Sequence, residues 1–527
     1  MLIATGSGPS AQDDGHDAAD GTPALDGCGR PVPAHLVGRR ALLTAAGATA
    51  VASWTTASPA AAAGSDSRHD NGTRGPVRRP SRGHHLIRGA ALVSVDPTIG
   101  NQAKADIEVR DGRIVRVGRD LRAPGARVID ASRMIAMPGF VETHYHMWSA
   151  LGRNFVSTGF EYFAAKAATV AAYQPDDFYD SVLLGLVECA NAGVTTVNNW
   201  AHNVRGPEYA DAELHAHADG LVRARYSYGH RDGQPATQPI DFADIDRVRA
   251  SWFGPKSPFD GLVHLGVNLR GPGQLDNFLA EMAQVRKRGL PISVHAGQGP
   301  TSAVRAANLE RMGFLGPDFL LCHALPFDEA DRQAMVRTGA PVSFAVHSEL
   351  RLGTAGGFHG QLLRMLAAGI TVSLSFDASS LAPINMFESM NVAWNLGIPH
   401  VGTDTAQLPA VVFRQAIEMA TINGARALGL DAVTGSITPG KRADIILLRA
   451  DDINIAPIGD LESTVVRSAT PANIDTVLID GRIVKQDREM VSHDVGTVVR
   501  NAAAAAHAVR TRAGGILTPA TSTPPRF

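Results

Sequence analysis

Four histidines and one aspartate lie at or near the ends of short apolar segments: His144, His146, His295, His323 and Asp377. His144 and His146 are two positions apart, so on a strand both side chains face the same way. Three imidazoles and one carboxylate suit zinc or a similar borderline divalent ion. These residue types therefore predict a metal centre in this chain.

The segments that carry these residues belong to a series of eight strand-like runs. The runs span residues 139–146, 193–200, 222–229, 262–271, 291–297, 319–325, 341–347 and 370–377. Helical or loop stretches separate them, and eight repeats of strand then helix predict a (β/α)₈ TIM barrel over residues 138–435. Because the carboxyl ends of barrel strands face the active site, we expect the metal-type residues to meet at one mouth.

A second sequence pattern occupies both ends of the folded part. Residues 85–137 and 436–490 contain short alternating strands separated by Gly and Asp turns. Two all-β pieces that flank a long α/β stretch predict one small β-sandwich domain built from the N- and C-terminal segments. The fold class is therefore α/β, a TIM barrel with an end-built β-domain.

The N-terminus has the features of a targeting segment. Arg39 and Arg40 precede a modest apolar run and then small residues near Ala62, which resembles a twin-arginine signal peptide over residues 1–63. The apolar run is shorter than the roughly 20 residues that a spanning helix needs. We expect export of the folded protein to the cell envelope or medium, with no membrane span in the mature chain.

Two further stretches fall outside the predicted domains. Residues 64–84 are rich in Gly, Arg and Ser and predict a flexible linker. Residues 491–527 predict an Ala-rich helix followed by a disordered Pro/Thr-rich tail.

Composition narrows the choice of partners. A net charge of −2 gives no electrostatic case for nucleic acid or anionic membranes, so we expect a small-molecule substrate. Three cysteines, two of them in apolar contexts, do not predict a disulfide framework. Homo-oligomerisation is compatible with the sequence, but no motif indicates it.

Longer motifs link residues 86–490 to a known family. They are MPGFVETHYHMW (137–148), LCHAL (321–325), HSELRLGTAGG (347–357), AAGITVSLSFDASS (367–380), ATINGARALGL (420–430) and GSITPGKRADIILL (435–448). The chain resembles the amidohydrolase superfamily, in particular its chlorohydrolase and cytosine/guanine-deaminase-like branch. The resemblance implies one divalent metal on His144, His146, His295 and Asp377, with His323 touching substrate and water. Zinc is the default, and iron, manganese or cobalt would fit the same ligands.

One metal is expected rather than two. Binuclear members of the superfamily use a lysine at the end of the fourth strand, and LVHLGVNLRG (262–271) contains none. A bound divalent ion would activate water for attack on a small molecule. In that reaction Asp377 would accept the proton and His323 would steady the oxyanion. The predicted activity is hydrolysis of a carbon–nitrogen bond other than a peptide bond.

One position departs from the family pattern. Deaminases of this branch carry His-x-x-Glu after the fifth strand, whereas His295 is followed by Gln298. An amide cannot exchange a proton near neutral pH, so ring deamination would lack its usual acid–base catalyst. A non-hydrolytic enzyme (lyase, isomerase or decarboxylase) and a ligand-binding protein on the same scaffold stay open as alternatives.

Four more residues follow strand ends and are candidates for substrate contact: Trp148, His202, Arg270 and His347. Arg270 is the best anchor among them, because a guanidinium can bind a carboxylate through two hydrogen bonds.

Overall fold

The computed structural model describes residues 77–156, 161–296, 303–352 and 357–515. The predicted signal peptide, most of the predicted linker, Gln298 and the predicted tail from residue 516 lie outside the described residues.

Eight parallel strands form the central sheet, in the order β6 to β13. They are β6 (Phe140–Tyr145), β7 (Val194–Ala201), β8 (Arg223–Tyr228), β9 (Val263–Leu269), β10 (Ile292–Ala296), β11 (Phe319–His323), β12 (Val342–Phe344) and β13 (Val372–Leu374). The first and last strands meet at a parallel bridge between Tyr145 and Asp377. The amide of His146 donates to the carbonyl of Asp377 at 2.7 Å, and the amide of Asp377 donates to the carbonyl of His144 at 2.8 Å. These contacts close the sheet and confirm the predicted barrel.

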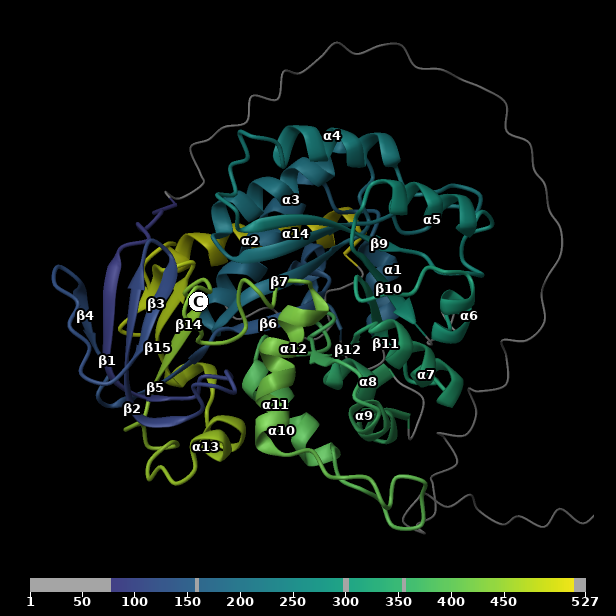
Figure 1. Ribbon diagram of the computed structural model, residues 1–527. Helices are drawn as coiled ribbons and strands as arrows, with labels where there is room; N and C mark the ends of the chain where they lie inside the picture. The colour runs from purple at the N-terminus through teal and green to yellow at the C-terminus, as the bar shows by residue number, and fades with distance from the viewer. Residues whose placement is uncertain (1–76, 157–160, 297–302, 353–356, 516–527) are drawn as a thin grey trace, which may run out of the picture. The chain divides into compact units, whose positions relative to one another are not determined.

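Helices follow the barrel strands along the chain and cover their outer side (Figure 1). They are α1 (Tyr162–Thr169), α2 (Pro175–Asn191), α3 (Pro207–Gly220), α4 (Phe242–Trp252), α5 (Phe278–Lys287), α6 (Ala306–Arg311), α7 (Glu329–Thr338), α8 (Val346–Leu352), α9 (Gly357–Ala367), α10 (Met386–Leu396), α11 (Phe413–Ala420) and α12 (Ile422–Ala427). A short 3₁₀ helix, η2 (Met147–Gly152), follows β6 directly. The loops at the mouth therefore begin within a few residues of the predicted metal ligands.

Capping residues explain where two of these helices begin. Gln174 and Asp177 form a reciprocal capping box at α2, whose first residue is Pro175. Asp328 and Asp331 do the same at α7. Gly339, the C-cap residue just after this helix, has the left-handed conformation. Each device satisfies backbone groups that the first or last helical turn would otherwise leave unpaired.

A nine-stranded mixed sheet makes the second layer of structure. Its strands are β1 (His84–Leu92), β2 (Gln102–Arg110), β3 (Arg113–Gly118), β4 (Arg127–Asp130), β5 (Met134–Pro138), β14 (Ile445–Arg449), β15 (Ile474–Ile479), β16 (Arg482–Gln486) and β17 (Glu489–Met490). β14 pairs with β5 in antiparallel register, which joins the N- and C-terminal pieces in one sheet. The β-domain is thus built from both ends of the folded part, as predicted.

The remaining helices accompany the C-terminal part. They are α13 (Leu461–Arg467), the 3₁₀ helix η4 (Pro471–Asn473) and α14 (Val495–Arg512). α14 is the predicted Ala-rich helix. Its buried Ala502, Ala505 and Val509 join the apolar cluster that contains Trp148 and Phe155 near the barrel mouth.

The junction between sheet and barrel is tightly packed. A Cβ added at Gly139, between β5 and β6, would lie 2.2 Å from the side chain of Thr195, so only glycine fits there. At the same junction, Arg223 donates from Nε to Oδ2 of Asp444 at 2.9 Å, and both side chains are fully buried. This buried ion pair links the barrel floor, formed by the amino-terminal ends of the barrel strands, to the nine-stranded sheet.

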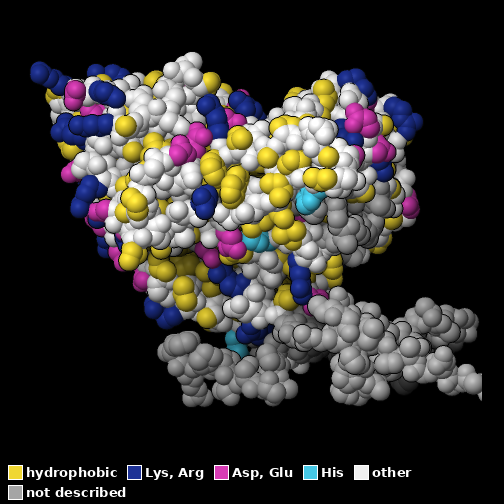
Figure 2. Space-filling model, turned by 90° about the horizontal axis from the view of Figure 1, so that it is seen from below, with side chains coloured by type: hydrophobic (Ala, Val, Ile, Leu, Met, Phe, Trp, Pro, Cys, Tyr) yellow, Lys and Arg dark blue, Asp and Glu magenta, His cyan; other side chains and the backbone are white. Residues whose placement is uncertain are grey.

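Three further observations concern the cysteines, the membrane and the surface charge. Cys189 and Cys322 are buried free thiols, as expected. No helix in the described part of the chain has the length and apolarity to cross a membrane. On the face shown in Figure 2, Lys and Arg side chains lie among Asp and Glu side chains.

Candidate metal centre

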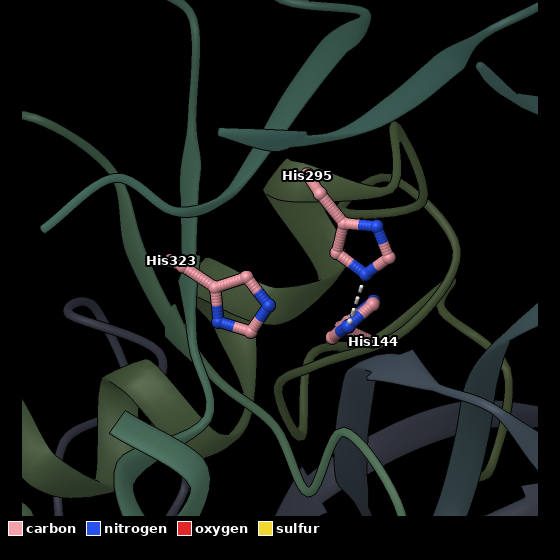
Figure 3. Close-up of side chains that lie close together, drawn as sticks. All are labelled: His144, His295 and His323. Atoms are coloured by element: carbon pink, nitrogen blue, oxygen red, sulfur yellow. Dashed lines mark hydrogen bonds between the residues drawn. The ribbon is translucent and has the colours of Figure 1, made fainter. Parts of the chain in front are cut away.

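Predicted site residues from four barrel strands meet at one mouth. His144 lies on β6 with His146 directly after it, His295 lies on β10, His323 ends β11, and Asp377 follows β13. Figure 3 shows the rings of His144, His295 and His323 pointing toward one another, and Nε2 of His144 lies 3.3 Å from Nε2 of His295. Strand ends in a closed barrel face a common axis, which explains the convergence.

The spacing of donor atoms fits a small divalent ion. Oδ1 of Asp377 lies 3.4 Å from Nε2 of His144 and 3.1 Å from Nε2 of His146. Ligand atoms about 2.0–2.2 Å from a tetrahedral zinc ion lie about 3.3–3.6 Å from one another. These two distances, and the 3.3 Å between His144 and His295, are close to that edge length, so these residues fit the metal that the ligand types predict.

The donor atoms form two overlapping groups that share His144. One group holds His144, His146 and Asp377, and the other holds His144, His295 and His323; within each group the donor atoms lie within 4.8 Å of one another. The four predicted ligands and His323 therefore occupy one continuous site.

Asp377 is held in an unusual conformation. Its φ of 65° is in the left-handed region, which is costly for a residue other than glycine and is found at functional sites. Ser348, on α8, donates a hydrogen bond of 2.5 Å to Oδ2, so Oδ1 is the oxygen turned toward the histidines. Burial raises the pKa of Asp377, but the close contacts with the imidazoles of His144 and His146 outweigh it and hold that pKa well below the ordinary value. The carboxyl group is therefore ionised at neutral pH.

His323 is oriented by a buried acid. Its φ is 75°, again left-handed, and its Nδ1 lies 2.9 Å from Oε1 of Glu349. Burial lowers the pKa of His323, yet the carboxylate of Glu349 overrides this and raises it above the ordinary value. With Nδ1 engaged, Nε2 is the atom that His323 turns toward the cluster.

The other three imidazoles are neutral. Burial lowers the pKa of His144, His146 and His295 below the ordinary value, although the carboxylate of Asp377 acts in the opposite direction. The ring of His295 also lies against Trp200, with centroids 4.2 Å apart. A neutral imidazole presents a lone pair, which is the form that binds a metal.

The four candidate substrate residues lie in different surroundings. Trp148 and His202 are buried beside His146, and the indole Nε1 of Trp148 donates to Nδ1 of His202 at 3.0 Å. The predicted strand 341–347 ends three residues earlier in the structure, at Phe344 of β12. His347 therefore lies on α8. The Nε2 of His347 is 4.0 Å from Glu388.

Arg270 has another task. Its two Nη atoms donate to the carbonyls of Gln234, Pro235 and Gln238, and so hold the loop between β8 and α4. Those bonds use three of the five N–H groups of the guanidinium, and the role of Arg270 as a substrate anchor stays a prediction.

Residue-by-residue reading of the sequence missed Ser348, Glu349 and Trp200. Ser348 and Glu349 stand inside the motif HSELRLGTAGG, and Trp200 ends the run GVTTVNNW. Those motifs were the available signal, but nothing local shows that a serine and a glutamate on α8 reach two different strand ends.

A small cavity lies beside Trp148. It is lined chiefly by Phe155, Tyr162, Tyr173 and Lys166, and its lining includes none of the five residues of the cluster.

Comparison with known proteins yields a consistent set of relatives. The pattern of the amidohydrolase family matches residues 135–484. A 5-methylthioadenosine/S-adenosylhomocysteine deaminase of Desulforudis audaxviator is 30% identical over 433 residues, 79% of this chain and 97% of that protein. A 5'-deoxyadenosine deaminase of Methanosarcina barkeri is 27% identical over 457 residues, 81% of this chain and 98% of that protein.

Solved structures give the same fold. An adenosine deaminase from Xanthomonas campestris with bound zinc aligns with a TM-score of 0.66 at 21% identity, covering 82% of this chain and all of that one. A variant of the atrazine chlorohydrolase TrzN from Arthrobacter aurescens, complexed with zinc and atraton, aligns with a TM-score of 0.68 at 19% identity, covering 80% of this chain and all of that one.

Proposed function

Because this chain belongs to the amidohydrolase family and is a metal-dependent hydrolase of non-peptide carbon–nitrogen bonds, we propose that one ion on His144, His146, His295 and Asp377 serves its reaction. The convergence of three imidazoles and a carboxylate carries this proposal, since His144 lies 3.3 Å from His295 and Oδ1 of Asp377 lies 3.4 Å from His144 and 3.1 Å from His146. Zinc is the preferred ion, since the ligands suit it and two structural neighbours contain it.

The chain's own residues supply the proton chemistry. A bound zinc ion contributes Lewis-acid chemistry that makes water nucleophilic near neutral pH. The ionised carboxylate of Asp377 accepts a proton from the attacking water. His323 donates a hydrogen bond from Nε2 to the oxygen that becomes negative, while Glu349 fixes its ring.

The substrate we propose is a small amino-substituted heterocycle of the nucleoside kind. The names of the relatives support this class. The predicted loss of acid–base help at Gln298 stays a prediction, because this residue lies outside the described part.

The direct test is metal analysis combined with a substrate panel. We expect one equivalent of metal in the purified protein, lost on His295→Ala. Adenosine-type nucleosides, ureas and amides would then be screened for ammonia release and product mass. Replacement of an amino group by hydroxyl supports the proposal, whereas products of unchanged mass would show a rearrangement and overturn it.

A restored family residue refines the same test. If Gln298 limits deamination, Gln298→Glu raises the rate on aminoheterocycles by about 10²–10⁴-fold, the usual contribution of general acid–base catalysis. Equal rates in the two proteins would show that the reaction needs no acid at this position.

A further inference from the structure

We propose that His202 is a positioning residue that fixes the tautomer and the orientation of His146, and that Asp232 and Lys166 hold His202 for this task. The inference rests on the proposed function, because it takes His146 as a metal ligand. It adds a role for three residues that lie behind the metal centre.

The contacts form a continuous chain from the surface to His146. Lys166 on α1 places Nζ 3.1 Å from Oδ2 of Asp232, which lies in the loop between β8 and α4. Oδ1 of Asp232 is 3.4 Å from Nε2 of His202, just after β7. Nδ1 of His202 is 3.1 Å from Nδ1 of His146.

Trp148 settles which nitrogens carry protons. Its indole nitrogen can only donate, and it donates to Nδ1 of His202, so that nitrogen carries no proton. A neutral His202 is then protonated on Nε2, the atom that faces Asp232.

The same logic extends to the metal ligand. Two lone pairs cannot face each other at 3.1 Å, so Nδ1 of His146 must be the proton donor to His202. The lone pair of His146 is thereby left on Nε2, so that a cation between this nitrogen and Oδ1 of Asp377, 3.1 Å away, would hold the two acceptors together in place of a proton. The chain thus selects the tautomer that can bind a metal through the correct nitrogen.

Two observations distinguish His202 from a histidine that is merely packed in the interior. One is its burial, and the other is a comparison of His146 with the ligand His144. His202 is 4% exposed, and its partners come from three other segments of the chain. Nδ1 of His144, by comparison, has no hydrogen-bond partner among the described residues. A hydrogen bond to the distal nitrogen of His146 is therefore a specific feature of that ligand.

The experiment compares two substitutions at His202 by zinc affinity, measured by competition with a chromophoric chelator. His202→Leu removes the acceptor and weakens zinc binding by about 10–100-fold, the usual cost of losing an outer partner of a metal ligand. His202→Asn places an amide oxygen near the position of Nδ1 and keeps affinity within about threefold of wild type. A purely structural histidine would not be rescued by asparagine.

Two controls separate folding from positioning. Thermal unfolding of the metal-free proteins should be the same for both His202 variants. His230→Leu, a change at a neighbouring half-buried histidine after β8, should leave zinc affinity unchanged. The d–d absorption of cobalt-loaded protein reports ligand geometry, and should shift in His202→Leu but not in His202→Asn.

The outcomes also distinguish this inference from the proposed function. If His146→Ala leaves zinc affinity unchanged, the metal centre itself is wrongly assigned. If His146→Ala weakens binding but His202→Leu does not, the metal centre stands and the positioning role is overturned. Equal weakening by His202→Leu and His202→Asn would likewise overturn it.

Discussion

Ser348 donates a hydrogen bond of 2.5 Å to Oδ2 of Asp377, while His144 and His146 contact the other oxygen of the same carboxylate. Oδ2 of the Asp377 carboxylate thus contacts a hydroxyl on α8, whereas Oδ1 contacts the two histidines at the end of β6. The division orients the carboxylate without neutralising it, which suits a group that must both face a metal and accept a proton.

Removing that hydroxyl should slow catalysis without unfolding the protein. A hydrogen bond to a charged group is worth about 1.5–3 kcal/mol, so Ser348→Ala should lower kcat by about 10–100-fold. Steady-state kinetics on the best substrate of the panel would measure this. Ser375→Ala is the matched control, because Ser375 is a buried barrel serine whose hydroxyl contacts only Ser343 among the hydrogen bonds described. Similar rates for the two variants would refute the role of Ser348.

The pairing of His323 with Glu349 predicts a separation of kinetic constants. Glu349→Gln keeps the size of the side chain but removes the charge beside Nδ1 of His323. If His323 acts mainly on the transition state, kcat should fall by about 10²-fold while KM changes little. Glu388→Gln, near His347 at the barrel rim, is the control and should leave both constants near wild type. A change confined to KM in Glu349→Gln would contradict the assignment.

Metal removal should lower thermal stability. A ligand that binds only the folded state stabilises it by about 4 kcal/mol at a thousandfold excess over its Kd. Dialysis against a chelator should therefore lower Tm, and added zinc should restore it. Asp377→Asn should abolish most of the zinc-dependent shift, because it replaces a charged ligand in the cluster. An unchanged zinc response in Asp377→Asn would place the ion elsewhere.

Glu213 predicts a pH dependence of stability unrelated to the metal. Burial on the inner side of α3 raises the pKa of Glu213 to about 8, although Asn199 donates to it at 2.7 Å. Between its ordinary pKa and 8, the unfolded chain ionises this group while the folded chain keeps it neutral. Stability therefore falls as pH rises across that window, by up to about 1.4 kcal/mol per pH unit.

Replacing the acid should remove this slope. The gain in Tm of Glu213→Gln over wild type should be larger at pH 8 than at pH 5. Burial lowers the pKa of the neighbouring His217 to about 3, so its contribution above pH 5 is the same in both proteins. Glu208→Gln, an exposed change on the same helix, should show no such trend. A pH-independent difference between Glu213→Gln and wild type would be inconsistent with a raised pKa.

The ion pair at the barrel floor predicts a large loss of stability. Arg223→Met leaves Asp444 buried without its cation, which costs about 3–5 kcal/mol. Chemical denaturation would measure the loss. Asp246→Asn breaks the more exposed pair with Arg288 and should cost no more than about 1 kcal/mol. Comparable losses in both variants would show that burial of the Arg223 pair adds nothing.

Much of the architecture followed from local pattern. Alternating apolar runs and their spacing indicated the eight strands, and position at a strand end indicated His144, His146, His295, His323 and Asp377. This worked because side-chain direction on a strand and the common edge of parallel strands are properties of the backbone, which neighbouring residues determine.

Partner choice was beyond local pattern. Arg270 donates to the loop between β8 and α4, Ser348 contacts Asp377 while Glu349 contacts His323, and Asp232 meets His202 across two loops. These contacts depend on the path of each loop and on closure of the barrel between β6 and β13. The sequence by itself determined which groups could bind a metal and at which end of the barrel. Only the tertiary structure decided which nitrogen or oxygen each group presents, because that depends on hydrogen bonds between segments far apart in the chain.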